Sequence, residues 1–233
     1  MKNPEVKYRH ELKYLVSAAQ IPLLESRVRC IMSPDRHAGP DGIYNIRSLY
    51  FDDYDNSCYY ENENGTDPRE KFRIRIYNHS SERITLECKR KDHGMTLKNS
   101  SPLNLEQSLK LIEGQPPVNM GELDALQRKF CLQMRGRLLH PVVIVEYERR
   151  PYVYKNGNVR VTFDTNISAG SDIEDFFSPD MRKRPIMPAG QHLMEVKFDE
   201  YLPDFIYRSL NLGQLRQTTF SKYSLCRKFT RLT

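Results

Sequence analysis

The stretch Lys71-Phe-Arg-Ile-Arg-Ile-Tyr77 alternates polar and apolar residues, and Glu82-Arg-Ile-Thr-Leu-Glu-Cys-Lys-Arg-Lys91 repeats the pattern shortly afterwards. Successive residues of a β-strand point to opposite faces. Each stretch therefore has one charged face and one apolar face. An ordinary antiparallel hairpin with one face in water also explains such alternation. These two strands alone predict a sheet and do not identify a site.

The same arrangement recurs in predicted strands at 7–16, 159–164 and 193–199. The charged faces of the five strands carry Arg9, Glu11, Lys13, Arg73, Arg75, Glu87, Lys89, Lys91, Arg160, Asp164, Glu195 and Lys197. A face in water does not require such regular placement of cations and carboxylates. A closed barrel explains it, because closure makes every strand contribute inward residues.

The order of the predicted elements indicates the fold class. Further strands are expected at 44–52 and 142–150, and only a short extension at 92–98. Helical periodicity predicts helices at 17–31, 105–112, 123–139, 203–212 and 219–229. Strands separated by short helices, without regular βαβ alternation, predict an antiparallel α+β fold. We expect one domain over residues 1–233, since no linker or repeat interrupts the chain.

Composition limits the partners of the protein. Lys and Arg total 36 against 30 Asp and Glu, a formal net charge of +6, which favours an anionic partner such as nucleic acid, a membrane surface or a phosphorylated ligand. Long basic blocks are absent, which favours a structured anion site. Five cysteines without a Cys-x-x-Cys pair are typical of reduced thiols in a cytosolic protein. No apolar run is long enough to span a bilayer. The sequence predicts a cytoplasmic protein.

The charged faces together have an excess of cations. Arg guanidinium forks and Lys ammonium groups in an enclosed site suit a polyanion. Carboxylates in the same site suit Mn²⁺ or Mg²⁺, which take oxygen ligands and bridge protein carboxylates to phosphates. The residues therefore predict a triphosphate or polyphosphate site.

Eight motifs, in order along the chain, carry a resemblance to a known family. They are Arg9-His-Glu-Leu-Lys-Tyr14, Ile46-Arg-Ser-Leu-Tyr-Phe-Asp52, Lys71-Phe-Arg-Ile-Arg-Ile-Tyr77, Leu86-Glu-Cys-Lys89, Glu146-Tyr-Glu-Arg149, Arg160-Val-Thr-Phe-Asp-Thr-Asn166, Met194-Glu-Val-Lys197 and Phe220-Ser-Lys-Tyr223. With them the chain resembles the triphosphate tunnel metalloenzyme (CYTH-like) superfamily. Within it, the chain resembles the VTC domain, the polyphosphate polymerase domain of the vacuolar transporter chaperone complex.

The resemblance implies a closed antiparallel β-tunnel of about eight strands with helices packed outside. It also implies an enzyme that transfers the terminal phosphate of ATP to a growing inorganic polyphosphate chain, with Mn²⁺ or Mg²⁺. Coupling to a membrane channel would require a membrane protein on a separate chain.

The resemblance also implies roles for individual residues. The implied catalytic residues are Lys13, Arg73, Arg75, Lys89, Arg160, Lys197 and Lys222. The implied substrate-binding residues are Ser221, Arg9, Arg47, Lys91 and Arg149. The implied metal ligand is Glu195, with Glu11 and Glu87 as second choices.

The chain departs from the superfamily pattern at two positions. Arg9 stands where the N-terminal signature has the first of two glutamates, so that only Glu11 remains there. After Tyr60, where polymerases carry a basic residue, the chain has acidic and amide residues at 61–64. Arg69 and Arg47 are the candidates to supply that charge.

Three other functions stay open at this point. The chain could be an enzyme of the same superfamily that hydrolyses tripolyphosphate or a nucleoside triphosphate. It could also be a non-catalytic polyphosphate-binding module. A generic RNA-binding role has the least support, because no base-stacking motif is evident. The fold by itself does not decide among these functions.

Overall fold

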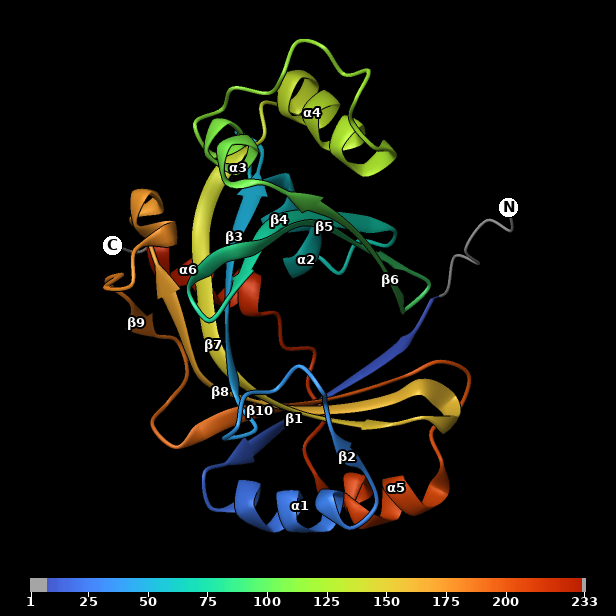
Figure 1. The fold of residues 1–233 in the computed structure, drawn as a ribbon. Helices are drawn as coiled ribbons and strands as arrows, with labels where there is room; N and C mark the ends of the chain where they lie inside the picture. The colour runs from blue at the N-terminus through green and yellow to red at the C-terminus, as the bar shows by residue number, and fades with distance from the viewer. Residues whose placement is uncertain (1–7, 232–233) are drawn as a thin grey trace.

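One curled antiparallel sheet forms the centre of the protein (Figure 1). The computed structural model describes residues 8–231. The strands lie in the order β1-β10-β8-β7-β3-β4-β5-β6. Their bounds are β1 (His10–Ser17), β3 (Tyr44–Asp52), β4 (Arg69–Tyr77), β5 (Ser80–Asp92), β6 (Met95–Leu103), β7 (His140–Tyr154), β8 (Val159–Gly170) and β10 (Gln191–Phe198). Two short strands, β2 (Ser33–Pro34) and β9 (Arg184–Pro185), pair with β7 and β8.

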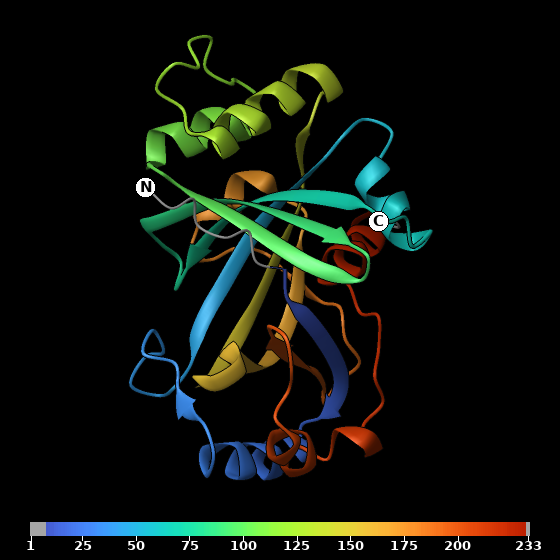
Figure 2. The same ribbon diagram turned by 90° about the vertical axis from the view of Figure 1, so that its right-hand side faces the viewer.

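The two edge strands of this path, β1 and β6, meet at a single bridge. The backbone N–H groups of Arg9 and Thr96 each donate to the other residue's carbonyl, both at 2.9 Å. In the part of the chain that the structure describes, no continuous ladder joins the two strands, so the sheet is open (Figure 2). This corrects the expectation of a closed tunnel. Alternation reveals which residues face inward, whereas closure depends on tilt and register across all strands.

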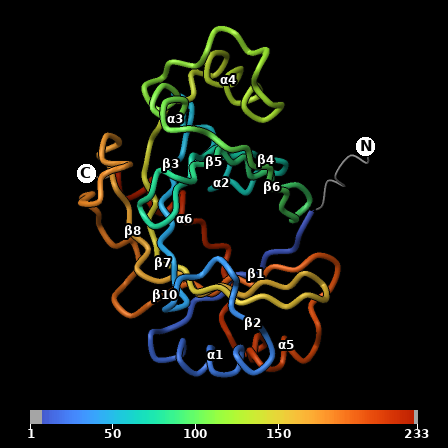
Figure 3. Tube along the Cα trace, in the orientation of Figure 1, coloured from blue at the N-terminus to red at the C-terminus, as the bar shows by residue number. Residues whose placement is uncertain are grey.

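The helices flank the sheet (Figure 1). They are α1 (Gln20–Arg29), α2 (Ser57–Glu63), α3 (Leu105–Ile112), α4 (Ala125–Arg137), α5 (Asp204–Ser209) and α6 (Lys222–Arg231). Short 3₁₀ turns follow at η1 (Asn156–Asn158), η2 (Ile173–Phe177) and η3 (Leu212–Gln214). The tube view shows α3 and α4 at one end of the molecule and α1 and α5 at the other (Figure 3). Among the described residues, none of the helices combines the length and apolarity needed to cross a bilayer.

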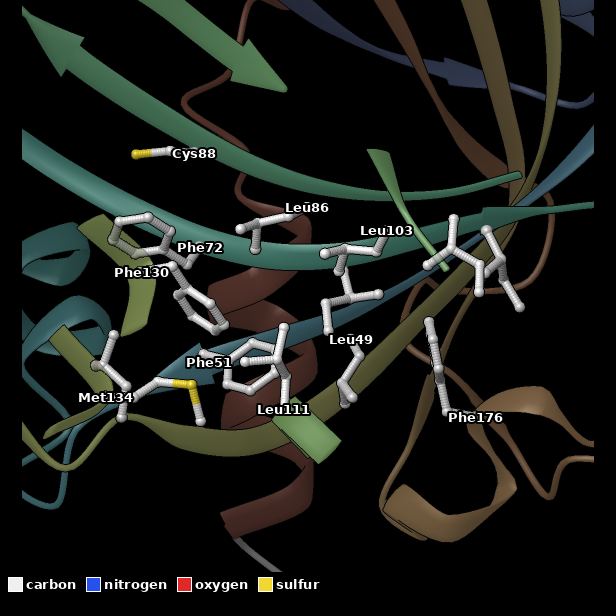
Figure 4. Packing of buried hydrophobic residues seen from close by; sticks show 14 of the residues in the cluster. Leu49, Phe51, Phe72, Leu86, Cys88, Leu103, Leu111, Phe130, Met134 and Phe176 are labelled. Carbon is white, nitrogen blue, oxygen red and sulfur yellow. The ribbon is translucent and has the colours of Figure 1, made fainter. Parts of the chain in front are cut away.

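Apolar packing on the outer face holds the sheet in its curled form. Phe51 and Phe72 pack against Phe130 of α4, with ring centroids 4.9 and 5.2 Å away, and Leu49 and Leu86 belong to the same cluster (Figure 4). A second cluster joins β1, β8 and β10 to α1 and α5. These two clusters support the two halves of the sheet from outside. They leave the opposite, concave face free to carry charge.

A third cluster lies on the concave face near the start of α6. Tyr223 and Cys226 of α6 are buried there with Tyr50 of β3 and Cys58 of α2. The fully buried carboxylate of Asp52 accepts hydrogen bonds from the backbone N–H of Cys58 and from the Tyr223 hydroxyl. α6 is thereby held against the sheet by a carboxylate at the end of β3.

Most expected elements are present, with one clear difference. The strand at 44–52 and the helix at 105–112 have the predicted bounds. β1 begins at His10, and Lys7 lies outside the described residues. The predicted extension at 92–98 instead covers the end of β5, a turn and the start of a full strand, β6, which pairs with β5 from Met95 to Leu103. Its centre is polar and exposed, so hydrophobic alternation gave little signal there.

The start of α4 generates a stability prediction. The Asp124 carboxylate accepts from the backbone N–H groups of Leu126 and Gln127 at 2.8 and 2.9 Å, and the Gln127 side chain completes a capping box. We expect Asp124→Ala to lower the free energy of unfolding by about 1–2 kcal/mol, as measured by urea denaturation. Asp124→Asn keeps a capping oxygen and should lose much less. An equal loss in both variants would contradict the capping role.

Candidate anion-binding site

Twelve of the charged side chains on the concave face form what we call the interior cluster. The cations are Lys13, Lys71, Arg73, Arg75, Lys89, Arg149, Lys197 and Lys222, and the carboxylates are Glu11, Glu87, Asp164 and Glu195. Strand register brings many of them together, because Arg73 lies opposite Glu87 and Arg149 lies opposite Asp164. All but Lys222, at the start of α6, are on strands.

Glu87 holds together the wall formed by β4 and β5. The Arg73 guanidinium donates to Glu87 Oε2 at 2.8 Å and to the Tyr50 hydroxyl at 2.6 Å. Arg75 lies 3.6 Å from the same carboxylate oxygen and donates to Ser48 Oγ at 3.0 Å. Burial acts to raise the pKa of Glu87, yet Arg75 and Arg73 hold it well below its ordinary value. Glu87 is therefore ionised at neutral pH.

A second network links β7, β8, β10 and α6. Arg149 makes two parallel bonds of 2.7 Å to the Asp164 carboxylate, and Lys222 Nζ lies 2.6 Å from the same group. Lys222 also donates to Glu195 Oε1 at 2.7 Å, while Lys197 lies 2.8 Å from Oε2. Burial raises the pKa of Glu195, but Lys197 and Lys222 hold it well below its ordinary value.

Glu11 connects β1 to β5 across the concave face. Its two oxygens lie 2.8 Å from Lys89 Nζ and 3.2 Å from Lys13 Nζ. Lys13 also donates to the Phe220 carbonyl at 2.7 Å, which fixes the chain just before α6. Burial lowers the pKa of Lys89 to about 8, with Glu11 opposing and Lys13 adding to the shift. An anion bound beside Lys89 would raise its pKa and favour the ammonium form.

The interior cluster contains eight cations against four carboxylates. Charges removed from water are costly unless they are compensated. Guanidinium and ammonium groups form strong, short hydrogen bonds with phosphate oxygens. A phosphate-rich anion therefore suits this face.

The structure places five predicted residues away from this cluster. Arg160 contacts the Tyr44 hydroxyl at 2.8 Å and Asp35 at 3.0 Å, toward one end of the concave face. Arg9 lies beside the β1–β6 bridge and pairs with Asp199 at 2.9 Å. Lys91 lies opposite Arg69 near the end of β5.

Arg47 and Ser221 have structural contacts. Arg47 is 1% exposed, pairs with Glu146 at 2.5 Å and donates to the Phe176 carbonyl at 3.0 Å. Its side chain lies on the outer face of the sheet, because neighbouring strand residues point to opposite faces and Ser48 points to the concave face. Ser221 Oγ accepts from the backbone N–H of Ser224 at 3.3 Å and so caps the first turn of α6.

Sequence reasoning assigned no site role to three residues of this face. Lys71 stands two positions before Arg73, in the same alternating pattern as Arg75, so this spacing already placed it on the charged face. Tyr50 and Tyr147 were missed because tyrosine carries no charge. Tyr50 accepts from Arg73, and the Tyr147 ring lies 4.8 Å from Lys222 Nζ.

The carboxylates do not by themselves form a metal site. Within the described residues, no three His, Cys, Asp or Glu side chains converge as metal ligands would. The charge of Glu195 acts to raise the pKa of Glu11, so the two carboxylates lie near each other, but each is bound by two lysines. Mg²⁺ is commonly held by one or two carboxylates plus substrate phosphates. The donor set therefore suits a metal that arrives with a phosphate ligand.

Comparisons with solved structures confirm the type of fold. The chain is similar to the putative adenylyl cyclase HpAC1 from Hippeastrum, described as having a dominant triphosphatase activity, with a TM-score of 0.56, 11% identity and 96% of each chain covered. It is also similar to a putative adenylate cyclase from Bacillus halodurans, with a TM-score of 0.50, 15% identity and 88% of each chain covered. No curated protein sequence matches the chain.

The fold is of the triphosphate tunnel (CYTH-like) class. Within this class, the chain belongs to the VTC domain family, which matches residues 8–230. The resemblance inferred from the eight motifs is thereby confirmed.

Acid denaturation tests the role of Glu87. A carboxylate with a lowered pKa stabilises the folded state above its unfolded pKa, and this contribution is lost as the pH falls. We expect the wild-type free energy of unfolding to fall between about pH 5 and pH 3. Glu87→Gln should show a smaller fall, and the exposed control Glu122→Gln should behave as wild type. Equal pH dependence in wild type and Glu87→Gln would contradict this role.

Proposed function

We propose that this VTC domain is a metal-dependent phosphotransferase that moves the γ-phosphate of ATP onto a growing inorganic polyphosphate chain. The observation that carries the proposal is the cation excess of the interior cluster, which has eight cations against four carboxylates. Membership of the VTC domain family supports the same ligand class. The ligands would be ATP and inorganic polyphosphate, with no role for nucleic acid.

The reaction requires chiefly positioning and charge neutralisation. The transition state of phosphoryl transfer is loose, and its charge is spread over the phosphate oxygens. Preorganised cations stabilise that charge without reorganising during the reaction. The guanidinium groups of Arg73 and Arg75 and the ammonium groups of Lys13, Lys89 and Lys197 would hold the donor and acceptor phosphates in line. Arg160, at the end of the face, would contact the outer part of a ligand.

Existing ion pairs must yield to the ligand. In the free protein Lys89 is bound to Glu11, and Lys197 and Lys222 are bound to Glu195. The oxygens of a bound phosphate chain would replace the carboxylates as partners of these ammonium groups, which would free the carboxylate oxygens. Glu195, with Glu11, would then hold Mn²⁺ or Mg²⁺, which would neutralise charge on the leaving diphosphate. Glu87 has a different role, since it is held between Arg73 and Arg75 and keeps their guanidinium groups in place.

Hydrolysis of tripolyphosphate or a nucleoside triphosphate is the second candidate function. The likeness to the Hippeastrum protein, described as a triphosphatase, favours it at the level of fold. Water would then replace the acceptor phosphate at the same face. Non-catalytic binding of polyphosphate is the third candidate. A cytoplasmic location and a membrane-protein partner on a separate chain stay predictions.

An elongation assay separates these functions. Purified protein would be incubated with ATP, Mn²⁺ and a short polyphosphate primer, and the products resolved by length on a gel. We expect chains longer than the primer, and none with Lys89→Ala, which removes an ammonium group at the centre of the face. Orthophosphate without elongation would instead indicate a hydrolase. Binding without turnover would indicate a binding module.

Arg75→Ala tests whether the buried arginines act on the ligand. We expect a fall in kcat/KM of about 100-fold or more, because a preorganised donor to the phosphates is lost. The fold should persist, since Glu87 keeps Arg73 as a partner at 2.6 Å. Circular dichroism checks the fold, and Lys110→Ala on the exposed face of α3 is the control. An unfolded Arg75→Ala protein would instead assign Arg75 to the structure.

A further inference from the structure

Charge compensation stops at one end of the concave face. Along β4 and β5, Arg73 lies opposite Glu87, and the two form an ion pair. At the beginning of β4 the pattern changes, because Lys71 lies opposite Lys89 and Arg69 lies opposite Lys91. Like charges directly opposite each other destabilise a sheet. Two such pairs in succession are a cost that a bound anion would remove.

Lys71 forms no ion pair with any of the described residues. Its Nζ donates to the Asn62 side chain on α2 at 2.6 Å and lies 4.8 Å from the centre of the Tyr223 ring on α6. Each of the other seven cations of the interior cluster lies within 4.0 Å of a carboxylate. An amide oxygen and an aromatic face offset only part of a full charge.

The neighbouring carboxylates are engaged elsewhere or lie farther off. Asp52, on β3, accepts from the Tyr223 hydroxyl and from backbone N–H groups of α2. The charge of Lys71 acts to lower the pKa of Glu61 on α2, but the two side chains form no ion pair among the described residues. Asp67, ahead of β4, accepts from the backbone N–H groups of His93 and Gly94.

These surroundings weaken the charge of Lys71 in the free protein. Burial is the main cause that lowers the pKa of Lys71 to about 7. The neighbouring groups that shift it come from four elements, and they are Arg69, Lys89, Lys13 and Cys58. Burial and Arg69 also lower the pKa of Lys91. Near neutral pH, Lys71 is therefore only partly protonated.

We propose that Arg69, Lys71 and Lys91 form a phosphate subsite that extends the interior cluster at its Lys71 end and selects a linear polyphosphate over a compact anion. Arg69, Lys71, Arg73 and Arg75 follow one another at every second residue of β4. At about 3.3 Å per residue, this row is about 20 Å long. An extended polyanion spans such a row, whereas pyrophosphate does not. The inference rests on the proposed function, because it assigns the same face to polyphosphate.

Occupation of this subsite is coupled to a proton. A phosphate beside Lys71 favours the ammonium form and raises the pKa of the group. Binding therefore takes up a proton when the pH is above 7, and affinity falls as the pH rises. An arginine at position 71 would stay charged throughout and would remove this coupling.

Calorimetric titration without divalent metal tests the length selection. The ligands are pyrophosphate and a linear polyphosphate long enough to span the row. We expect Lys71→Met to weaken polyphosphate binding roughly tenfold or more at pH 7, because a charge-assisted hydrogen bond is lost. Pyrophosphate binding should change by less than about threefold, and the exposed control Lys110→Met should match wild type. Equal losses for the two ligands, or no loss, would overturn the proposal.

The same titration at several pH values tests whether polyphosphate binding is coupled to protonation of Lys71. Between pH 6 and 8, wild-type affinity for polyphosphate should fall about tenfold more than that of Lys71→Arg. The comparison cancels the titration of the polyphosphate itself, since both proteins bind the same ligand. Equal pH dependence would overturn the subsite even if Lys71→Met unfolds, because Lys71→Arg keeps charge and length.

The outcomes also separate this inference from the proposed function. Wild-type protein that binds polyphosphate with the expected Lys71 dependence but elongates nothing would overturn the polymerase function alone. Elongation that is normal, with polyphosphate affinity unchanged in Lys71→Met, would overturn the subsite alone. A wild-type protein that binds no polyphosphate would overturn both.

Discussion

The compensation of partly buried positive charge is the constraint on which this structure depends. The interior cluster has eight cations, and four carboxylates hold seven of them in ion pairs. Each carboxylate serves at least two cations, as Glu87 does for Arg73 and Arg75. Because such pairs offset desolvation only when their geometry is good, the strands must be held in fixed register. The charged face thus places strict demands on the rest of the fold.

Apolar packing on the outer face of the sheet holds the strands in this register. The apolar sides of β4 and β5 pack with α4 around Phe130, and β1, β8 and β10 pack with α1 and α5. Apolar burial is the main favourable contribution to folding, so it offsets repulsion among the cations. The start of α6 adds a further restraint, because Tyr223 bonds Asp52 while the adjacent Lys222 bridges Asp164 and Glu195. The first turn of α6 therefore contributes both a buried hydrogen bond and ion pairs.

The site could be predicted where alternation was regular and where each strand contributed cations. Arg73, Arg75, Lys89 and Lys197 lie on the face that period-two spacing gives them. Arg47 shows the limit of a motif, since it adjoins Ser48 in β3 and so points to the opposite face, where Glu146 binds it. The resemblance included Lys71 in a motif but implied no role for it, although its spacing from Arg73 is the same as that of Arg75. Its distinct environment arises from α2 and α6, which are distant in sequence.

The sequence by itself determined the antiparallel α+β class, the charged face of each strand and the family. Each of these follows from residue periodicity or ordered motifs, which are local properties of the chain. Only the tertiary structure decided that β1 and β6 meet at one bridge, leaving the sheet open. It also decided which carboxylate serves which cation, and that Lys71 has an amide and a ring as neighbours. Pairings of this kind depend on contacts between distant strands and helices, and local spacing does not encode them.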